Sequence, residues 1–440
     1  MRIMQTLRSS YRRSCLASLL LASAGAACSS SSSGGDIDSP QGIESAKSAL
    51  SRVTTPSSTH VSALGADNRA FAFDMLHAIA ADHPGENLLF SPYSISTALA
   101  MTYEGARGQT ASEMQTTLHF ELDKPALHEA FNATDLALSS RGQGQAGADG
   151  TPFRLNVDNS FWMQRDYPVL PAYLDVLAVN YGARVFLADF ASDPEHARSA
   201  INQWVSDKTE KLIPELLPAG SIRADTPLVL TNTVYFNASW QTKFELDNTR
   251  AAPFTKLDGS QVSVSMMGMG RQLPYAEGAG WRAVALPYSS PGLQFVAVLP
   301  DAGHYQAVED SLDAAWFDAM QAAAQARSVS VSLPKLDYQA HVSLKKELRS
   351  LGMSSAFGAA DFSGMTTSPV AIDDVIHQAV IKVFEGGTIA AAATAVTIRD
   401  ASIALFDENV TLDRPFLFAI FDQATGSLLF VGRVLDPTAM

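Results

Sequence analysis

One short segment of this chain consists mostly of residues whose side chains are too small to anchor it by packing. It spans residues 385–394 and reads Glu-Gly-Gly-Thr-Ile-Ala-Ala-Ala-Ala-Thr. Its glycines permit backbone conformations that other residues avoid, so its start is flexible. Apolar, strand-like stretches at 375–384 and 415–421 flank the segment and anchor both of its ends. We therefore expect a hinge that can change packing partners while its ends stay in place.

A plain helix is the alternative interpretation of residues 388–397, because alanine has the highest helix propensity. Two features weaken it. Glycines precede the alanines, and the residues that follow, Val396, Thr397 and Ile398, are β-branched and favour extended backbone.

The composition indicates a globular protein with a large core and an acidic surface. The 440 residues are 47% hydrophobic, which is enough for two average domains or one large one. The formal net charge is -14, and the chain beyond residue 27 is more acidic still because residues 1–27 hold four arginines and no acid. Such a surface repels polyanions, so we expect no nucleic-acid partner.

The N-terminal residues are typical of a bacterial export signal. Arginines precede an apolar stretch at 16–22, and small residues follow up to Ala27. The small residues before Cys28 resemble a lipoprotein processing site, at which that cysteine becomes the lipid anchor. Gly25 stands where such sites prefer leucine, so ordinary signal cleavage is the alternative. We expect an exported protein, either attached to the cell envelope at Cys28 or secreted.

Cysteine is nearly absent, which limits how the fold can be stabilised. Cys15 and Cys28 are the two cysteines, and the first lies in the expected signal. The mature fold therefore has no internal disulfide, and a thiolate metal site is excluded. We expect no metal and no cofactor.

The order of patterns along the chain favours one large α+β domain over residues 63–437. Residues 28–62 are rich in Ser, Gly, Thr and Pro and are expected to form a flexible tether. Helical spacing prevails from Asn68, with Ser91 as a predicted cap for a helix that begins at Pro92. Residues 228–236 predict a strand buried on both faces.

Strands prevail after Trp240, with predicted strands at 262–267, 281–286, 293–299 and 329–333 and one late helix capped by Ser343. Helices first and strands later are the pattern of an α+β fold.

No catalytic motif is present. The sequence lacks G-x-S-x-G, H-E-x-x-H, G-x-x-x-x-G-K-[ST] and C-x-x-C. Gly142, Gly144 and Gly147 have dinucleotide-loop spacing but lack the flanking strand and helix, so they predict a surface loop. His377 follows an apolar stretch and is interpreted as a hydrogen-bonded core residue, not a general base. We expect that the protein is not an enzyme.

From about Asn68 to Pro437 the chain resembles the serpins. The resemblance rests on motifs that begin at Asn87 (NLLFSPYSI), Gly105 (GARGQT), Leu228 (LVLTNTVYF), Leu286 (LPY), Asp361 (DFSGM), Ile376 (IHQA), Arg414 (RPFLFAI) and Leu429 (LFVGRV), together with the hinge. It implies three β-sheets, eight or nine helices and an exposed reactive loop at about residues 385–412.

The resemblance also implies a mechanism. A serine protease cuts the loop and forms an acyl-enzyme, and insertion of the cut loop into the main sheet traps the protease irreversibly. Serpin loop insertion is an established example of strand addition. The alternative is a non-inhibitory member whose loop is cut as a plain substrate.

The hinge that the resemblance implies comprises Glu385, Gly386, Gly387, Thr388, Ala390, Ala391, Ala392, Ala393 and Thr394. Alternate residues of an inserting strand face the core, and Thr388, Ala390, Ala392 and Thr394 share that parity and are all small. Ile389 stands where the family has glutamate. It faces outward after insertion, where an isoleucine favours loop–sheet polymers of an otherwise monomeric protein.

Family spacing from Gly387 implies a scissile bond at Ala401–Ser402. A small residue before the cut suits an elastase-like or subtilisin-like protease. Counting back from Pro415 points near Ala404 instead, and Arg399 offers a trypsin-like alternative. The sequence does not identify the protease.

Further residues match sites that the family uses to open its main sheet. Ser91, Ser94, Asn232 and His377 match the shutter, a hydrogen-bond network beneath the opening strands, and Trp240 matches the breach, where the loop enters. The alternative interpretation is that the four polar residues are ordinary core residues whose hydrogen bonds are satisfied, with no role in sheet opening.

Overall fold

The computed structural model describes residues 40, 42–145, 147–148, 150, 153–388 and 406–439. These residues contain nine α-helices, in agreement with the expected eight or nine. They are α1 (Val61–Asp82), α2 (Pro92–Gly105), α3 (Gly108–Thr117), α4 (Lys124–Ser140), α5 (Pro171–Tyr181), α6 (Pro194–Lys208), α7 (Tyr305–Ser311), α8 (Ala314–Ala323) and α9 (Lys345–Ser350). Two 3₁₀ turns, Leu246–Asn248 and Ser355–Phe357, complete the helical elements of this part of the chain.

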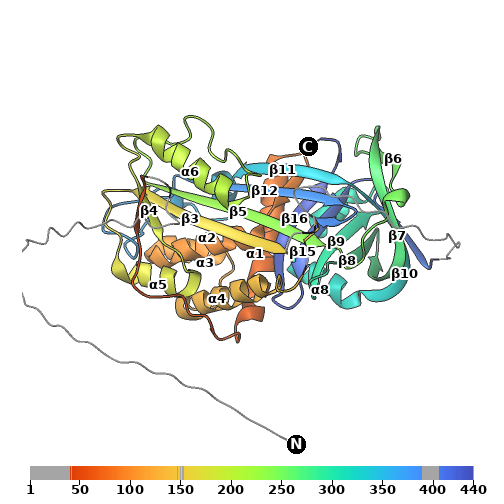
Figure 1. Cartoon of the computed structure of the whole chain (residues 1–440), viewed down its shortest axis with the longest axis horizontal. Helices are drawn as coiled ribbons and strands as arrows, with labels where there is room; N and C mark the ends of the chain where they lie inside the picture. The colour runs from red at the N-terminus through yellow and green to blue at the C-terminus, as the bar shows by residue number, and fades with distance from the viewer. Residues whose placement is uncertain are drawn as a thin grey trace, which may run out of the picture. The chain divides into compact units, whose positions relative to one another are not determined.

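The first sheet has seven strands, one of which is formed by the hinge residues Gly387 and Thr388. In spatial order the strands are β1 (Glu44–Ala46), β4 (Val185–Ala188), β3 (Arg154–Gln164), β5 (Leu228–Ser239), β13 (Gly387–Thr388), β12 (Asp374–Phe384) and β11 (Leu336–Ser343). Figure 1 shows the long strands β3, β5, β12 and β11 side by side. All twelve residues of β5 are buried, as the sequence predicted for a strand covered on both faces.

The second sheet has nine strands. They are β14 (Glu408–Thr411), β10 (Gln325–Pro334), β7 (Gln261–Gly278), β8 (Trp281–Pro287), β9 (Leu293–Pro300), β15 (Phe416–Asp422), β16 (Ser427–Val434) and β2 (Leu88–Phe90) in spatial order, with β6 (Arg250–Thr255) beside β7. The resemblance implied three sheets in all. The described residues form two, because β7 is long enough to pair with β6 at its start and with β8 at its end.

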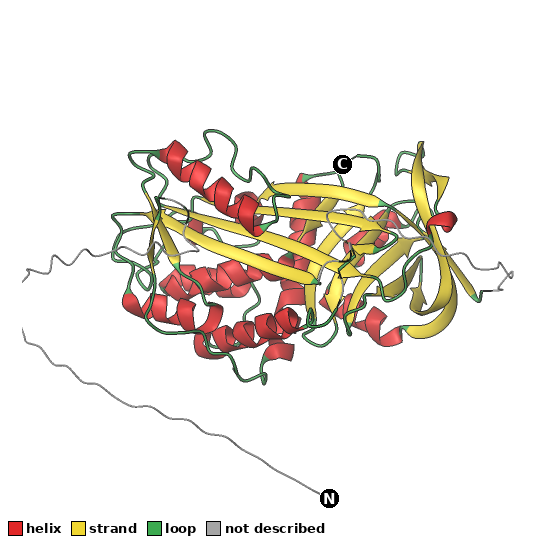
Figure 2. Ribbon diagram, viewed as in Figure 1, coloured by secondary structure: helices red, strands yellow, loops and turns green. Residues whose placement is uncertain are grey.

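Helices cover the two faces of the first sheet unequally. Figure 2 shows most helices grouped on one side of the long strands, and α6 on the opposite side. The larger core joins the first group to both sheets, whereas a smaller core lies under α6 and includes Trp162, Trp204, Val229 and Ile376. Any strand that enters the first sheet must therefore fit between these two cores.

Most local predictions agree with the structure. Ser91 caps α2, accepting a hydrogen bond from the Ser94 amide, and Pro92 is the first helical residue. The predicted strands match β7, β8, β9 and β10, and the final hairpin pairs β15 with β16. The Ser343 cap was wrong. Leu344 precedes α9, and the Ser343 hydroxyl donates to Asp374 instead.

The predicted flexible tether at 28–62 was wrong from residue 42 onward. Residues 44–46 form β1, which pairs antiparallel with β4. Arg52 forms an ion pair with Asp135 on α4 at 2.7 Å, and the Val53 amide donates to the Val179 carbonyl on α5. The polar composition of this segment predicted a flexible chain. Instead, strand pairing at the edge of the sheet and hydrogen bonds attach the segment to the domain.

Within the described ranges, no helix combines the length and apolar character that a membrane span requires.

Candidate functional site

The start of the hinge lies between two strands of the first sheet. Gly387 and Thr388 form β13, which pairs antiparallel with Phe384 and Val383 of β12 on one side. On the other side they pair with β5. Below this point β5 and β12 pair directly with each other, in parallel, over residues 229–234 and 374–379. The two strands thus separate at one end, and the hinge enters the opening.

Gly387 is required by this close approach. Its φ is +153°, and a Cβ added there would lie 2.1 Å from the Ala238 carbonyl oxygen. No larger residue fits that space without moving the backbone of β5.

The predicted breach residue Trp240 lies at the opening. Its indole Nε1 donates to the Phe384 carbonyl at 2.9 Å, and its amide donates to the Gly386 carbonyl at 3.1 Å. Its ring stacks on Tyr288 with 4.6 Å between centroids. The Tyr288 hydroxyl lies 2.6 Å from that of Thr388, which is buried. Trp240 and Tyr288 thus hold the hinge where it enters the sheet.

Glu385 is held in place just before Gly387 and Thr388 enter the sheet. Its carboxylate forms an ion pair with Lys335 at 2.8 Å and accepts a hydrogen bond from the Thr249 hydroxyl at 2.7 Å. Burial would raise the pKa of Glu385, but these two partners outweigh burial and keep the pKa below its usual range. The carboxylate is therefore charged at neutral pH, and it attaches the hinge to Lys335, between β10 and β11, and to the turn before β6.

The four predicted shutter residues form one buried network. The Ser91 amide donates to His377 Nε2 at 3.0 Å, and His377 Nδ1 hydrogen-bonds the Asn232 side-chain carbonyl. The Asn232 amide donates to Ser94 and to Asn159. The network therefore joins α2, β3, β5 and β12, and it crosses the line at which β5 and β12 would part.

Asn159 is a member of this network that the sequence analysis missed. It lies directly opposite Asn232 in the β3–β5 pairing. A usable signal was present, because polar and apolar residues alternate here and Asn159 shares the parity of Leu155, Val157 and Phe161.

Both ring nitrogens of His377 are occupied. Because Nε2 accepts from an amide, the proton lies on Nδ1 and is donated to Asn232. Burial, with a smaller contribution from His341, lowers the pKa of His377 to about 3. A neutral ring with both nitrogens engaged in the core cannot serve as a general base.

The depressed pKa of His377 gives a pH prediction. Below about pH 6.5 the unfolded chain binds a proton that the folded chain does not, so stability is complete above that pH and falls on acidification towards pH 3. We expect His377 to lower the free energy of unfolding by about 2 kcal/mol when the pH falls from 7.5 to 5. Chemical unfolding of wild type and of His377→Gln at both pH values measures it. An equal loss of stability in the two proteins would contradict the assignment.

Several predicted site residues lie outside the described residues. These are the hinge residues Ala390, Ala391, Ala392, Ala393 and Thr394, the reactive bond Ala401–Ser402 and the lipid anchor Cys28. The described part of the site contains Glu385, Gly386, Gly387, Thr388, Trp240 and the shutter. No group of three or more His, Cys, Asp or Glu residues suited to a metal ion occurs in the described portion of the chain.

The described site is thus a pair of strands, β5 and β12, that separate at one end and hold Gly387 and Thr388 between them. Comparison with known proteins identifies the family to which this arrangement belongs. The family model for serpins (serine protease inhibitors) matches residues 66–437. The chain belongs to the serpin family.

Relatives and solved structures extend this match. An uncharacterized serpin-like protein of Thermococcus kodakarensis is 37% identical over 371 residues, 84% of each chain. The human leukocyte elastase inhibitor is 33% identical and is covered over 99% of its length, against 85% of this chain. The crystal structure of the thermophilic serpin tengpin in its native state matches with a TM-score of 0.77 and 29% identity, over 90% of this chain and 99% of tengpin.

Proposed function

We propose that the chain is an irreversible, suicide-substrate inhibitor of a serine endopeptidase and not an enzyme. The observation that carries the proposal is β13, the two hinge residues that already pair with both β5 and β12. An inhibitor of this kind needs a loop whose first residues are positioned to enter the main sheet once the loop is cut. A serpin whose hinge has no access to the sheet lacks the driving step.

The register of β13 supports this proposal when it is continued along the hinge. Thr388 pairs with Ala238 and Val383, both of which are core residues. Continued in the same register, every second residue faces this core, so Ala390, Ala392 and Thr394 enter it. Thr394 then arrives between Asn232 and His377. Its hydroxyl can replace the hydrogen bond that those two residues lose when β5 and β12 part, so insertion leaves no buried polar group unpaired.

The proposed target is a protease with a shallow specificity pocket. Alanine precedes the expected cut at Ala401–Ser402, and small residues suit elastase-like and subtilisin-like enzymes. Similarity to the leukocyte elastase inhibitors of human and frog supports this class. Incubation with an elastase, a subtilisin and a trypsin tests the proposal directly. We expect an SDS-stable complex with at least one of the first two, and cleavage without any complex would contradict inhibition.

Mass spectrometry of the fragment released from the complex locates the reactive bond. We expect the C-terminal fragment to begin at Ser402, because the fourteen residues 388–401 would fill the length of the sheet edge. A fragment that begins at Asp400 would move the bond to Arg399 and favour a trypsin-like target. A fragment that begins at Leu405 would move it to Ala404.

The second candidate is a non-inhibitory serpin. It predicts turnover of the loop by the same proteases with no trapped complex. Bulky or charged inward hinge residues would favour it, and Thr388, Ala390, Ala392 and Thr394 are none of these.

We also propose that the protein is exported and acts as a monomer at the cell envelope or outside the cell. The signal-like residues 1–27 and the small residues before Cys28 support export. Mass analysis of the mature N-terminus distinguishes a lipid-modified Cys28 from ordinary signal cleavage.

A further inference from the structure

An open groove of about 530 Å³ lies between α1 and the segment that follows α3. Its wall on α1 is made by residues that share one helical face, at spacings of three and four positions, namely Ala63, Ala66, Asp67 and Ala70. Three of these side chains are single methyl groups, so they leave room beside the helix. The groove is lined by no hinge, breach or shutter residue, and the sequence analysis did not predict it.

The opposite wall of the groove is the turn after α3. Leu118 and Phe120 are buried and fix this turn to the core, while His119 between them takes a left-handed conformation with φ of +56°. The chain therefore turns back towards α1 and brings Glu121 beside Asp67. The Glu121 amide donates to Asp67 Oδ2 at 3.4 Å.

Asp67 is a buried carboxylate without a cationic partner. Its side chain lines the groove although the residue is only 6% exposed. Among the described residues no group donates to Asp67 Oδ1, and no lysine or arginine pairs with Asp67 or Glu121. Burial raises the pKa of Asp67 to about 6, and the negative charge of Glu121 adds to the rise. A cation in the groove would therefore stabilise the charged form of Asp67.

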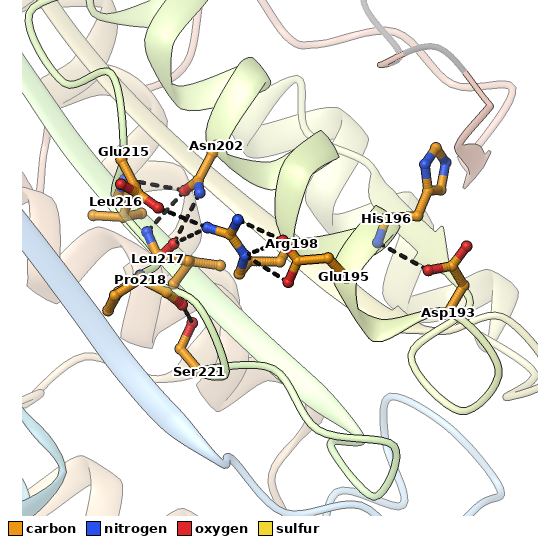
Figure 3. Close-up of polar contacts among 10 residues, drawn as sticks. All are labelled: Asp193, Glu195, His196, Arg198, Asn202, Glu215, Leu216, Leu217, Pro218 and Ser221. Atoms are coloured by element: carbon orange, nitrogen blue, oxygen red, sulfur yellow. Dashed lines mark hydrogen bonds and ion pairs between the residues drawn. The ribbon is translucent and has the colours of Figure 1, made fainter.

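Glu195 and Glu215, near α6, show how this chain satisfies carboxylates elsewhere. In Figure 3 the Arg198 guanidinium lies between them and donates to Glu195 at 2.6 Å and to Glu215 at 2.8 Å. Both of these carboxylates are more than half exposed, whereas Asp67 is buried. Asp67 thus lacks the kind of partner that they have, although an unpaired charge costs more in a buried position than in an exposed one.

The side chains that line the groove offer hydrogen-bond acceptors and few free donors. Besides the two carboxylates, Gln115 has a side-chain carbonyl to offer, because its amide donates to a backbone carbonyl at 3.0 Å. The Thr116 hydroxyl donates within α3. His119 Nε2 hydrogen-bonds Asp74 at 2.7 Å. A ligand that complements this groove must therefore carry donors and a positive charge.

We propose that the groove binds an alkylguanidinium group, with Asp67 as its ion-pair partner. A guanidinium has five N–H donors, no acceptor and a permanent positive charge, and it binds a carboxylate through two parallel hydrogen bonds. The alanine side chains of α1 leave space for the alkyl chain. A metal ion is a poorer match, because no three metal-ligating side chains converge here or elsewhere in the described ranges. The inference does not depend on the proposed function.

Saturation-transfer NMR on the full chain tests the groove with n-butylguanidinium at pH 7.5. The matched ligand control is n-butylurea, which has a similar shape and no charge. We expect the wild type to bind the guanidinium at least tenfold more tightly than the urea, because the charge-assisted pair is lost with the urea. Asp67→Asn should weaken guanidinium binding by a similar factor. Asp166→Asn, an exposed aspartate in the turn after β3, should leave it unchanged.

A second variant keeps the carboxylate and fills the groove. Ala66 is exposed on α1, so Ala66→Leu should leave the melting temperature unchanged and weaken guanidinium binding at least tenfold. A guanidinium that binds the wild type no better than the urea does would overturn the proposal, as would unchanged guanidinium binding in Asp67→Asn or Ala66→Leu.

A blocked Gly-Arg-Gly peptide distinguishes two sources of the same chemistry. If the peptide binds more tightly than n-butylguanidinium, the natural occupant is an arginine within a polypeptide. If it binds equally or more weakly, the occupant is a small free guanidinium compound. Both results support the guanidinium site, provided that Asp67→Asn weakens binding of the tighter of the two ligands.

Discussion

Replacing Thr388 with arginine is expected to convert the protein from an inhibitor into a substrate. Thr388 is buried between β5 and β12 and hydrogen-bonded to Tyr288. An unpaired charge forced into this position costs about 3–5 kcal/mol, which slows insertion roughly a hundredfold or more. Hydrolysis of the acyl-enzyme then finishes before the protease is trapped. The measurement is the ratio of SDS-stable complex to cleaved chain after incubation with the target protease.

The matched control for this variant is Thr388→Ser, which keeps the hydroxyl that faces Tyr288 and should trap the protease as wild type does. The uncut arginine variant should keep its fold, because β13 is two residues long and can withdraw from the sheet. Its melting temperature should therefore stay within a few degrees of wild type. Unchanged trapping by a folded arginine variant would show that Thr388 does not enter the core, and the inserting parity would be wrong.

The sequence analysis predicted the strands better than the contacts around the hinge. The strands β5, β9 and β15 can be recognised in the sequence because each is a mostly apolar run, as expected of a strand whose residues are all buried. The parity of Thr388 follows from the alternation of any strand. Tyr288 and Lys335 hold the hinge from elements far away in the sequence. Tyr288 belongs to the LPY motif and Lys335 to no motif, and neither position is marked as a hinge contact by its local sequence.

The errors have physical causes as well. Ser343 has the side chain of a helix cap, but Asp374 lies beside it in the folded sheet and takes its hydroxyl. The first described strand, β1, is three residues long and too short to show a period, so its pairing with β4 depends on tertiary contacts alone. The position of such a short edge strand is set by its pairing with a neighbouring strand, and its own sequence does not predict it.

Cleavage of the loop is expected to stabilise the protein strongly. In the uncut form Gly387 and Thr388 lie between β5 and β12, which pair directly with each other farther along, whereas a cut loop is expected to continue between them to about Ala401. Insertion adds on the order of ten to twenty ladder hydrogen bonds at about 1 kcal/mol each. For a domain of this size each kcal/mol raises the melting temperature by roughly 1.3 °C, so we expect a rise of about 15–25 °C.

The thermal measurement separates insertion from cleavage itself. A protease that cuts within residues 389–405 but is not trapped, followed by its removal and a thermal scan, should give the large rise in wild type. The same cut in Thr388→Arg should give a much smaller one, because the first residue to enter carries a charge that the core between Ala238 and Val383 cannot solvate. A cut wild-type chain that melts at the temperature of the uncut chain would mean that the slot does not accept the loop. The two hinge residues in β13 would then be a fixed end of the sheet and not the first step of insertion.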